Sequence, residues 1–138
     1  MTAVPAHAPL RIARPSHDIT VAERFWVDGV GMAVQWRADA GTEIGHALLM
    51  VGLPGAAWHL ELVDDRAIAN AHPPGPEDLL VLYLDSPVPT DLVERIAAAG
   101  GTVVASRNPY WDRWGVTLRD PDGYLLVLCE RDWPAASP

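Results

Sequence analysis

The sequence predicts one α+β domain made of two copies of a βαβββ module. Apolar and alternating segments occur twice in the same order, each time with a helix signal after the first strand. A proline-rich stretch separates the two series, and 138 residues that are 49% hydrophobic suffice for one core. The prediction is a single domain over 1–138, with modules at 10–65 and 79–130 and a linker at 66–78.

The first module opens with a short strand over Leu10–Ala13 that Pro15 is expected to stop. Asp18 then stands where a helix N-cap belongs, and apolar residues follow at helical spacing until Gly29. Alternation and apolar runs predict three further strands, over Met32–Arg37, His46–Val51 and Trp58–Val63.

The linker and the second module repeat this order. Residues 66–78 hold three prolines among polar and small residues and are predicted to be a surface linker. Asp91 and Glu94 have capping-box spacing at the start of an alanine-rich helix. The predicted strands are Leu79–Leu84, Thr102–Ser106, Gly115–Arg119 and Tyr124–Leu128, the last two joined by an Asp-Pro-Asp-Gly turn.

Composition excludes several classes of partner. The net charge is −8 and the ten arginines are scattered, so we expect no nucleic-acid partner. Every apolar run is short, and the N-terminus lacks a secretory signal, so we expect a cytoplasmic protein without a membrane partner. Cys129 is the only cysteine, which rules out an intrachain disulfide.

Two segments resemble the vicinal oxygen chelate superfamily, which includes glyoxalase I, fosfomycin-resistance enzymes, extradiol dioxygenases and bleomycin-resistance proteins. They are GVTLRDPDGYLLVLCE at the C-terminal end and HDITVAERFWVDGVGM near the N-terminus, within a likeness that covers Leu10 to Glu130. The resemblance implies that the two modules curl into a cupped mixed sheet around a small-molecule cavity. It also implies a homodimer.

The same resemblance implies four strand positions that bind a divalent cation in other members. Here those positions fall on Arg11, Glu61, Leu79 and Val127, of which only Glu61 can be a ligand. We therefore expect no cofactor, with a divalent metal (Zn, Ni, Mn or Fe) as the alternative. His59 lies two residues before Glu61, on the same face of a strand, and would be the second ligand in that case.

Arg11, Glu61 and His59 are the candidate catalytic residues, and Arg11 and Glu61 are also candidate ligand-binding residues. Arg11 could bind a carboxylate, phosphate or enolate of the ligand while Glu61 orients it. Alternatively, the two form only a salt bridge. His59 could transfer a proton as a general acid or base, or it could be a packed strand residue.

Aromatic residues supply the other candidate ligand contacts. Three of them lie in a predicted loop and would form a stacking surface for a planar ligand, or else cover the core or a dimer contact: Tyr110, Trp111 and Trp114. Trp36 is a fourth candidate, because alternation places it on one apolar strand face with Met32 and Val34.

Three functions follow from these residues. The first is a metal-free protein that binds and sequesters an aromatic or cationic small molecule, as in antibiotic self-resistance. The second is a metal-independent isomerase, cyclase or lyase that uses Arg11, Glu61 and His59. The third is a metal-dependent lyase or dioxygenase.

Overall fold

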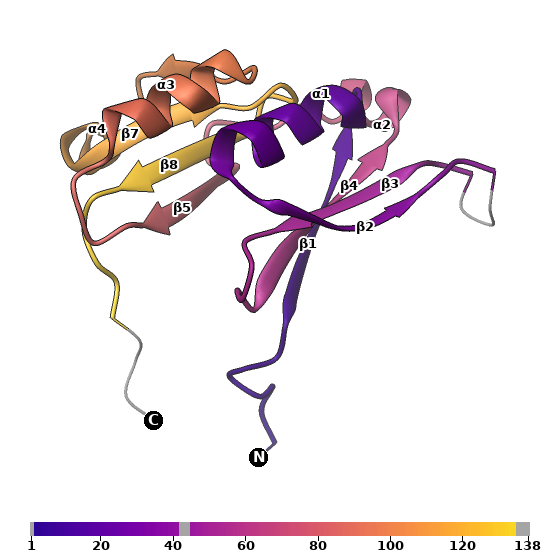
Figure 1. Cartoon of the computed structure of the whole chain (residues 1–138), viewed down its shortest axis with the longest axis horizontal. Coiled ribbons are helices and arrows are strands. Elements are labelled where there is room, and N and C mark those ends of the chain that lie inside the picture. The colour runs from indigo at the N-terminus through magenta and orange to yellow at the C-terminus, as the bar shows by residue number, and fades with distance from the viewer. Residues whose placement is uncertain (1, 42–44, 135–138) are drawn as a thin grey trace.

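The chain folds into two four-stranded mixed sheets with the same strand order. A computed structural model describes residues 2–41 and 45–134. The sheets run β1-β4-β3-β2 and β5-β8-β7-β6, so each is built from one βαβββ module (Figure 1). The predicted α+β fold is thereby confirmed.

In each sheet the first strand pairs in parallel with the last, and the other pairs are antiparallel. The first module contains β1 (Leu10–Ser16), α1 (Ile19–Glu23), the π-helical continuation η1 (Arg24–Val30), β2 (Ala33–Ala38), β3 (Leu48–Gly52) and β4 (Trp58–Asp64). The second contains β5 (Leu79–Tyr83), α3 (Thr90–Ala98), β6 (Thr102–Val104), α4 (Pro109–Trp114), β7 (Gly115–Arg119) and β8 (Leu125–Cys129).

The helix starts agree only in part with the sequence prediction. Asp18 is the N-cap of α1, since its carboxylate accepts from the backbone N–H groups of Thr20 and Val21. The predicted capping box at Asp91 is wrong. Helix α3 begins at Thr90, so its N-cap position is Pro89, two residues before Asp91, and no side chain caps it. None of the helices in residues 2–41 and 45–134 is long and apolar enough to cross a membrane.

Two short helices occupy segments that were predicted to lack regular structure. The first half of the expected linker is α2 (Arg66–Ala71), which Asp65 caps by accepting from the backbone N–H of Ile68. The expected aromatic loop is α4, which Asn108 caps. Pro109 follows as the first helical residue, where its missing N–H has no cost.

Pro15 does not stop the first strand, which continues to Ser16. The strand β1 lies at the edge of its sheet and pairs only with β4. An edge strand tolerates proline because the missing N–H can be the one that faces away from the sheet. The predicted end of this strand at Ala13 is therefore wrong.

One core joins the two modules. The largest buried side chains of η1, Phe25 and Trp26, pack with Ile96 of α3 and with apolar residues from both sheets. Close contact between η1 and α3 requires a small residue at Gly29, where an added Cβ would lie 3.1 Å from the Cα of Ile96. The helices α1 and α3 therefore cover one face of each sheet (Figure 1).

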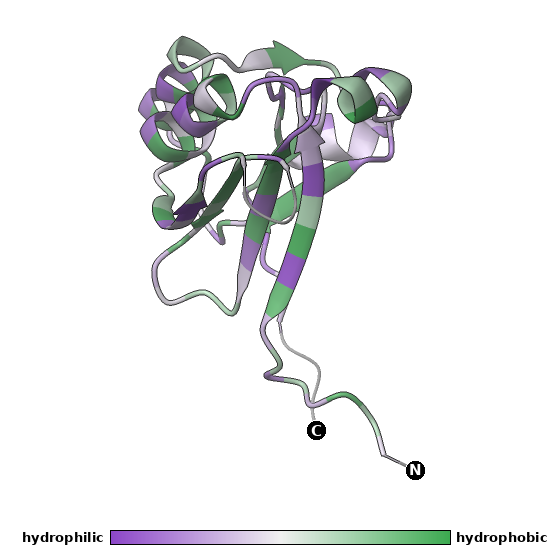
Figure 2. Cartoon of the chain, turned by 90° about the vertical axis from the view of Figure 1, so that its right-hand side faces the viewer, coloured by the Kyte–Doolittle hydropathy of each residue, from purple (hydrophilic) through white to green (hydrophobic). Residues whose placement is uncertain are grey.

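We call the sheet face turned away from α1 and α3 the inner face. In β4, Leu60 and Leu62 are buried against the helices, so the alternating residues His59 and Glu61 lie on the inner face. Figure 2 shows the matching alternation of hydrophobic and hydrophilic residues along β1, the strand that rises from the N-terminal segment. The inner faces are where the superfamily cavity was predicted.

Candidate functional site

Arg11, His59 and Glu61 come together on the inner face of the first sheet. Arg11 and His59 are partners in the parallel register of β1 and β4. The Arg11 Nε donates to the His59 Nε2 at 2.9 Å, and Arg11 Nη1 lies 3.4 Å from Glu61 Oε2. The Arg11 side chain is 53% exposed and that of Glu61 18%. The arginine side of this ion pair therefore faces solvent, while most of the Glu61 side chain is covered.

The contact with Arg11 sets the hydrogen-bond role of His59. A guanidinium is always a donor, so the Nε2 of His59 is the acceptor in this hydrogen bond. The lone pair that would take a proton from a substrate is thus already engaged. In this arrangement His59 holds Arg11 in place, and Glu61 has the free acceptor oxygen.

Trp36 lies in a row with Glu61 across the same inner face. Cross-strand partners run from Trp36 on β2 to Met50 on β3 and then to Glu61 on β4. The Trp36 side chain is 60% exposed, so its ring is available for a ligand. An indole and a carboxylate are thereby presented on one open surface beside Arg11.

The predicted grouping of Trp36 with Met32 and Val34 is wrong. Met32 is buried in the core, and Val34 pairs with Val51 on the helix-covered face. A β-bulge between Val34 and Trp36 adds one residue to β2 and turns Trp36 to the inner face.

The four positions that bind metal in other superfamily members do not form a metal site here. Arg11 brings a permanent positive charge to within 3.4 Å of Glu61, the one carboxylate among them. Leu79 and Val127 offer no donor atom, and they lie on the inner face of the other sheet. Within the described residues, no three His, Cys, Asp or Glu side chains are grouped to hold a metal ion. This donor set does not fit a divalent cation.

The middle of the second sheet's inner face is buried. Helix α4 packs on β7 and β8, and the inner-face residues Thr117 and Val127 are almost fully buried. The hydroxyl of Thr117 has no hydrogen-bond partner. This face is therefore closed in the region that matches the open first sheet.

The three predicted aromatic residues, Tyr110, Trp111 and Trp114, lie on the helix α4. Trp111 meets Tyr83 of β5 edge-on, with ring centroids 6.5 Å apart, and Tyr110 packs edge-on against Trp111. Trp114 lies under the guanidinium groups of Arg113 and Arg131, and Arg131 also donates to the hydroxyl of Tyr110 at 3.0 Å. Sequence reasoning missed Tyr83 as a member of this group, since its place at the end of an apolar run gave no signal.

Ionisable residues join the two modules at the Asp-Pro-Asp-Gly turn. Asp122 accepts from the backbone N–H of His17 at 2.8 Å, and Arg14 lies 4.2 Å over the ring of Tyr124. Burial, reinforced by the nearby Asp122, raises the pKa of Asp120 to about 6. Burial also lowers the pKa of Arg14. This joint fixes the end of β1 against the second sheet.

Comparison with known proteins agrees with the two-module organisation. The model of the YycE-like N-terminal domain matches residues 10–63, and that of the YycE-like C-terminal domain matches residues 77–130. A relative, protein YycE of Bacillus subtilis (strain 168), is 34% identical over 122 residues, which cover 88% of this chain and 86% of the relative. The chain belongs to the YycE-like family.

Solved structures connect this YycE-like chain to the wider superfamily. A crystal structure of a YycE protein of unknown function from Bacillus subtilis, named as a candidate glyoxalase/fosfomycin resistance protein, has a TM-score of 0.76 at 29% identity and covers 95% of both chains. TnmS3, an antibiotic binding protein from Streptomyces sp. CB03234, has a TM-score of 0.62 at 27% identity and covers 95% of this chain and 100% of its own. The resemblance to the vicinal oxygen chelate superfamily is confirmed.

Proposed function

We propose that this YycE-like protein binds a planar aromatic small molecule on the inner face of the first sheet and holds it chemically unchanged. The observation that carries this proposal is the solvent-facing cluster of Arg11, His59 and Glu61 beside the exposed Trp36. A function in sequestration, such as antibiotic self-resistance, fits a site that binds without an evident catalytic group.

The cluster has the donors and the surface that such a ligand needs. Arg11 uses Nε on His59 and Nη1 on Glu61, and its guanidinium has further N–H groups for a ligand oxygen. The indole of Trp36 offers a flat apolar surface for stacking. Because Arg11 already neutralises Glu61, the aromatic alternative is better supported than the cationic one.

We further propose that binding needs no metal cofactor, neither Zn, Ni, Mn nor Fe. Arg11 supplies a positive charge at a position where other members of the superfamily have a residue that binds the metal cation. TnmS3, which is 27% identical to this chain, is named as an antibiotic binding protein and gives independent support for small-molecule binding.

A metal-independent isomerase, cyclase or lyase is the second candidate function. One observation favours it: Arg11 lies 3.4 Å from the Oε2 of Glu61 and contacts only that oxygen of the carboxylate. Arg11 could then polarise a substrate oxygen while the other carboxylate oxygen accepts a proton. Against it stands the engaged lone pair of His59, which leaves Glu61 as the only base of the three. If this candidate is right, Glu61→Gln abolishes turnover and leaves binding largely intact.

The test is a binding screen of the full-length protein with planar aromatic antibiotics. Native mass spectrometry and tryptophan fluorescence report binding, and the mass of the released compound reports whether it has changed. We expect release of unmodified ligand, and a dissociation constant that rises at least about tenfold in Trp36→Ala.

The matched control is Trp133→Ala, because Trp133 is also exposed but lies against Tyr83 of the second module. Equal affinity of Trp36→Ala and the wild type would overturn the proposed site. Release of a compound with an altered mass would show that the protein catalyses a reaction and does not only sequester its ligand.

We expect the protein to act as a homodimer. The inner face of the first sheet is open in a single chain, with Arg11 and Trp36 more than half exposed. A second copy that covers part of this face would enclose the ligand. Light scattering coupled to gel filtration gives the mass of the assembly, and a mass of one chain at micromolar concentration would contradict this expectation.

A further inference from the structure

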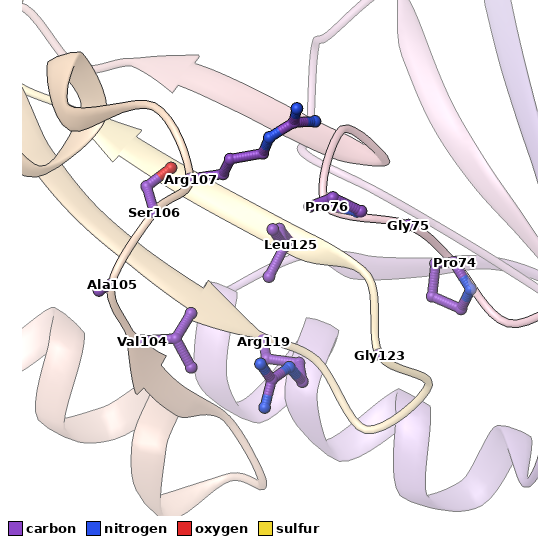
Figure 3. A pocket seen from close by; sticks show the side chains of 10 residues that line it. All are labelled: Pro74, Gly75, Pro76, Val104, Ala105, Ser106, Arg107, Arg119, Gly123 and Leu125. Carbon is purple, nitrogen blue, oxygen red and sulfur yellow. The ribbon is translucent and has the colours of Figure 1, made fainter.

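A separate pocket of about 400 Å³ lies between the proline-rich connection and the loop that follows β6. It shares no residue with the cluster of Arg11, His59 and Glu61. Figure 3 shows the connection with Pro74 and Pro76 on one side of the strands that carry Arg119 and Leu125, and the segment with Val104 and Arg107 on the other. A pocket of this size can take a small organic molecule.

Arg119 gives this pocket a cation that is free to bind. It is the last residue of β7, where its register partner on β8 is Leu125 and its neighbour Leu118 is buried toward the helices. Its side chain therefore lies on the inner face. Among the residues that the structure describes, Arg119 forms neither an ion pair nor a side-chain hydrogen bond.

Arg107 supplies a second cation from the opposite wall. Its Nη1 lies 3.6 Å from Glu77 Oε1, and the two side chains are 67% and 70% exposed. An ion pair as exposed as this contributes little stability, because water screens both charges. A ligand anion can therefore take the place of Glu77 at small cost.

Hydrogen bonds hold the two walls in shape. Asp78 accepts from the backbone N–H of Gly75 at 2.6 Å, and Asp112 accepts from that of Ser106 at 2.9 Å. Both carboxylates are thus occupied with the backbone. Leu125 lies between the two arginines in the view of Figure 3, so the pocket has an apolar floor between two positive groups.

We propose that this pocket binds a small organic anion, a carboxylate or phosphate group carried on an apolar body. A guanidinium binds either group through two parallel hydrogen bonds. The chain has a net charge of −8, and Glu77, Asp78 and Asp112 lie beside the walls of the pocket. Attraction of an anion therefore rests on Arg119, which has no carboxylate partner among the described residues, and on displacement of Glu77 from Arg107. The apolar body of the ligand would rest on Leu125 and Val104, while the anion engages Arg119, and Arg107 adds a positive charge at the opposite wall.

The test is a titration of the ¹⁵N-labelled full-length protein with phenyl phosphate, with benzoate and with neutral benzyl alcohol, followed by NMR. We expect saturable shifts of the backbone amides of Gly75, Ser106 and Arg119 with the two anions and none with the alcohol. The preferred anion is the one with the lower dissociation constant. In Arg119→Gln that constant should rise at least about tenfold, and further in the double variant with Arg107→Gln.

Arg24→Gln is the matched control, because Arg24 is equally an exposed arginine but lies on η1 over the helix-covered face. It should leave the dissociation constant unchanged, as should Trp36→Ala, so that this site is tested separately from the proposed aromatic site. The proposal fails if neither anion gives saturable shifts, if the double variant binds as tightly as the wild type, or if the shifts centre on Arg11 and His59.

Discussion

The inner faces of the two sheets differ although the sheets share one strand order. On the first sheet, this face carries Arg11, His59 and Glu61 and is open to solvent. On the second, it carries Leu79 and the fully buried Val127 where the first has Arg11 and Glu61, and Arg119 lies at its exposed edge. The fold therefore constrains the helix-covered face and the inner face of a sheet unequally.

The helix-covered faces show what the fold requires. Leu60 and Leu62 of β4 have counterparts in Leu126 and Leu128 of β8, and all four are in the shared core. Burial of these side chains stabilises both modules through the same hydrophobic contacts. The inner faces are under no such constraint, so one can present charges while the other closes over apolar residues.

The largest expected effect comes from placing the same polar group on both inner faces. Val127→Gln places an amide at a fully buried position, where the unpaired hydroxyl of its cross-strand partner Thr117 cannot satisfy both the oxygen and the nitrogen, and should lower the free energy of unfolding by about 3 kcal/mol. Val63→Gln on β4 is the control, since Val63 is only half-buried beside an open pocket, and should cost less than about 1 kcal/mol. Urea unfolding measures both. Equal losses would mean that the two faces do not differ as described.

A smaller effect is expected at the joint between the sheets. Burial raises the pKa of Asp120 from 3.8 to about 6, so the folded state binds its proton more tightly than the unfolded chain. The contribution of protonated Asp120 to the free energy of unfolding is therefore fully present below about pH 4 and is lost as the pH rises through about 6. Asp120→Asn should raise the free energy of unfolding by about 2 kcal/mol at pH 8, and by much less at pH 4. A gain that is independent of pH would contradict the raised pKa.

The smallest effect on stability is expected at the site itself. Arg11→Met and Glu61→Gln should each change the free energy of unfolding by less than about 1 kcal/mol, because the Arg11 side chain is 53% exposed and water screens its charge. Either change should nevertheless weaken ligand binding. A double-mutant cycle by thermal unfolding gives the coupling energy of the pair, and a value above about 2 kcal/mol would show a structural salt bridge instead.

Local sequence patterns predicted what depends on local structure. Apolar runs located the strands, and Asp18 located the start of α1. The resemblance to the superfamily predicted that Arg11 and Glu61, 50 residues apart in the chain, could be neighbours. In the structure Arg11 Nη1 lies 3.4 Å from Glu61 Oε2. Spacing alone could not have paired them, because the register of a parallel pair is set by the whole sheet.

The wrong predictions have two causes. Some features depend on contacts between distant parts of the chain, and one local signal was overlooked. The bulge that turns Trp36 to the inner face depends on pairing with β3, and alternation within β2 cannot show it. The helix α4 had a local signal, an asparagine cap followed by proline, which the tryptophans of the segment obscured. The pocket of Arg107 and Arg119 had none, since its walls are distant in sequence.

Equilibrium dialysis with Zn²⁺ and Ni²⁺ tests most directly whether Arg11 organises the open inner face in place of a metal. The wild-type protein should retain no stoichiometric metal at micromolar concentration. The variant R11H, which adds an imidazole beside His59 and Glu61, should bind one ion per chain. One tightly held ion per wild-type chain would contradict the account.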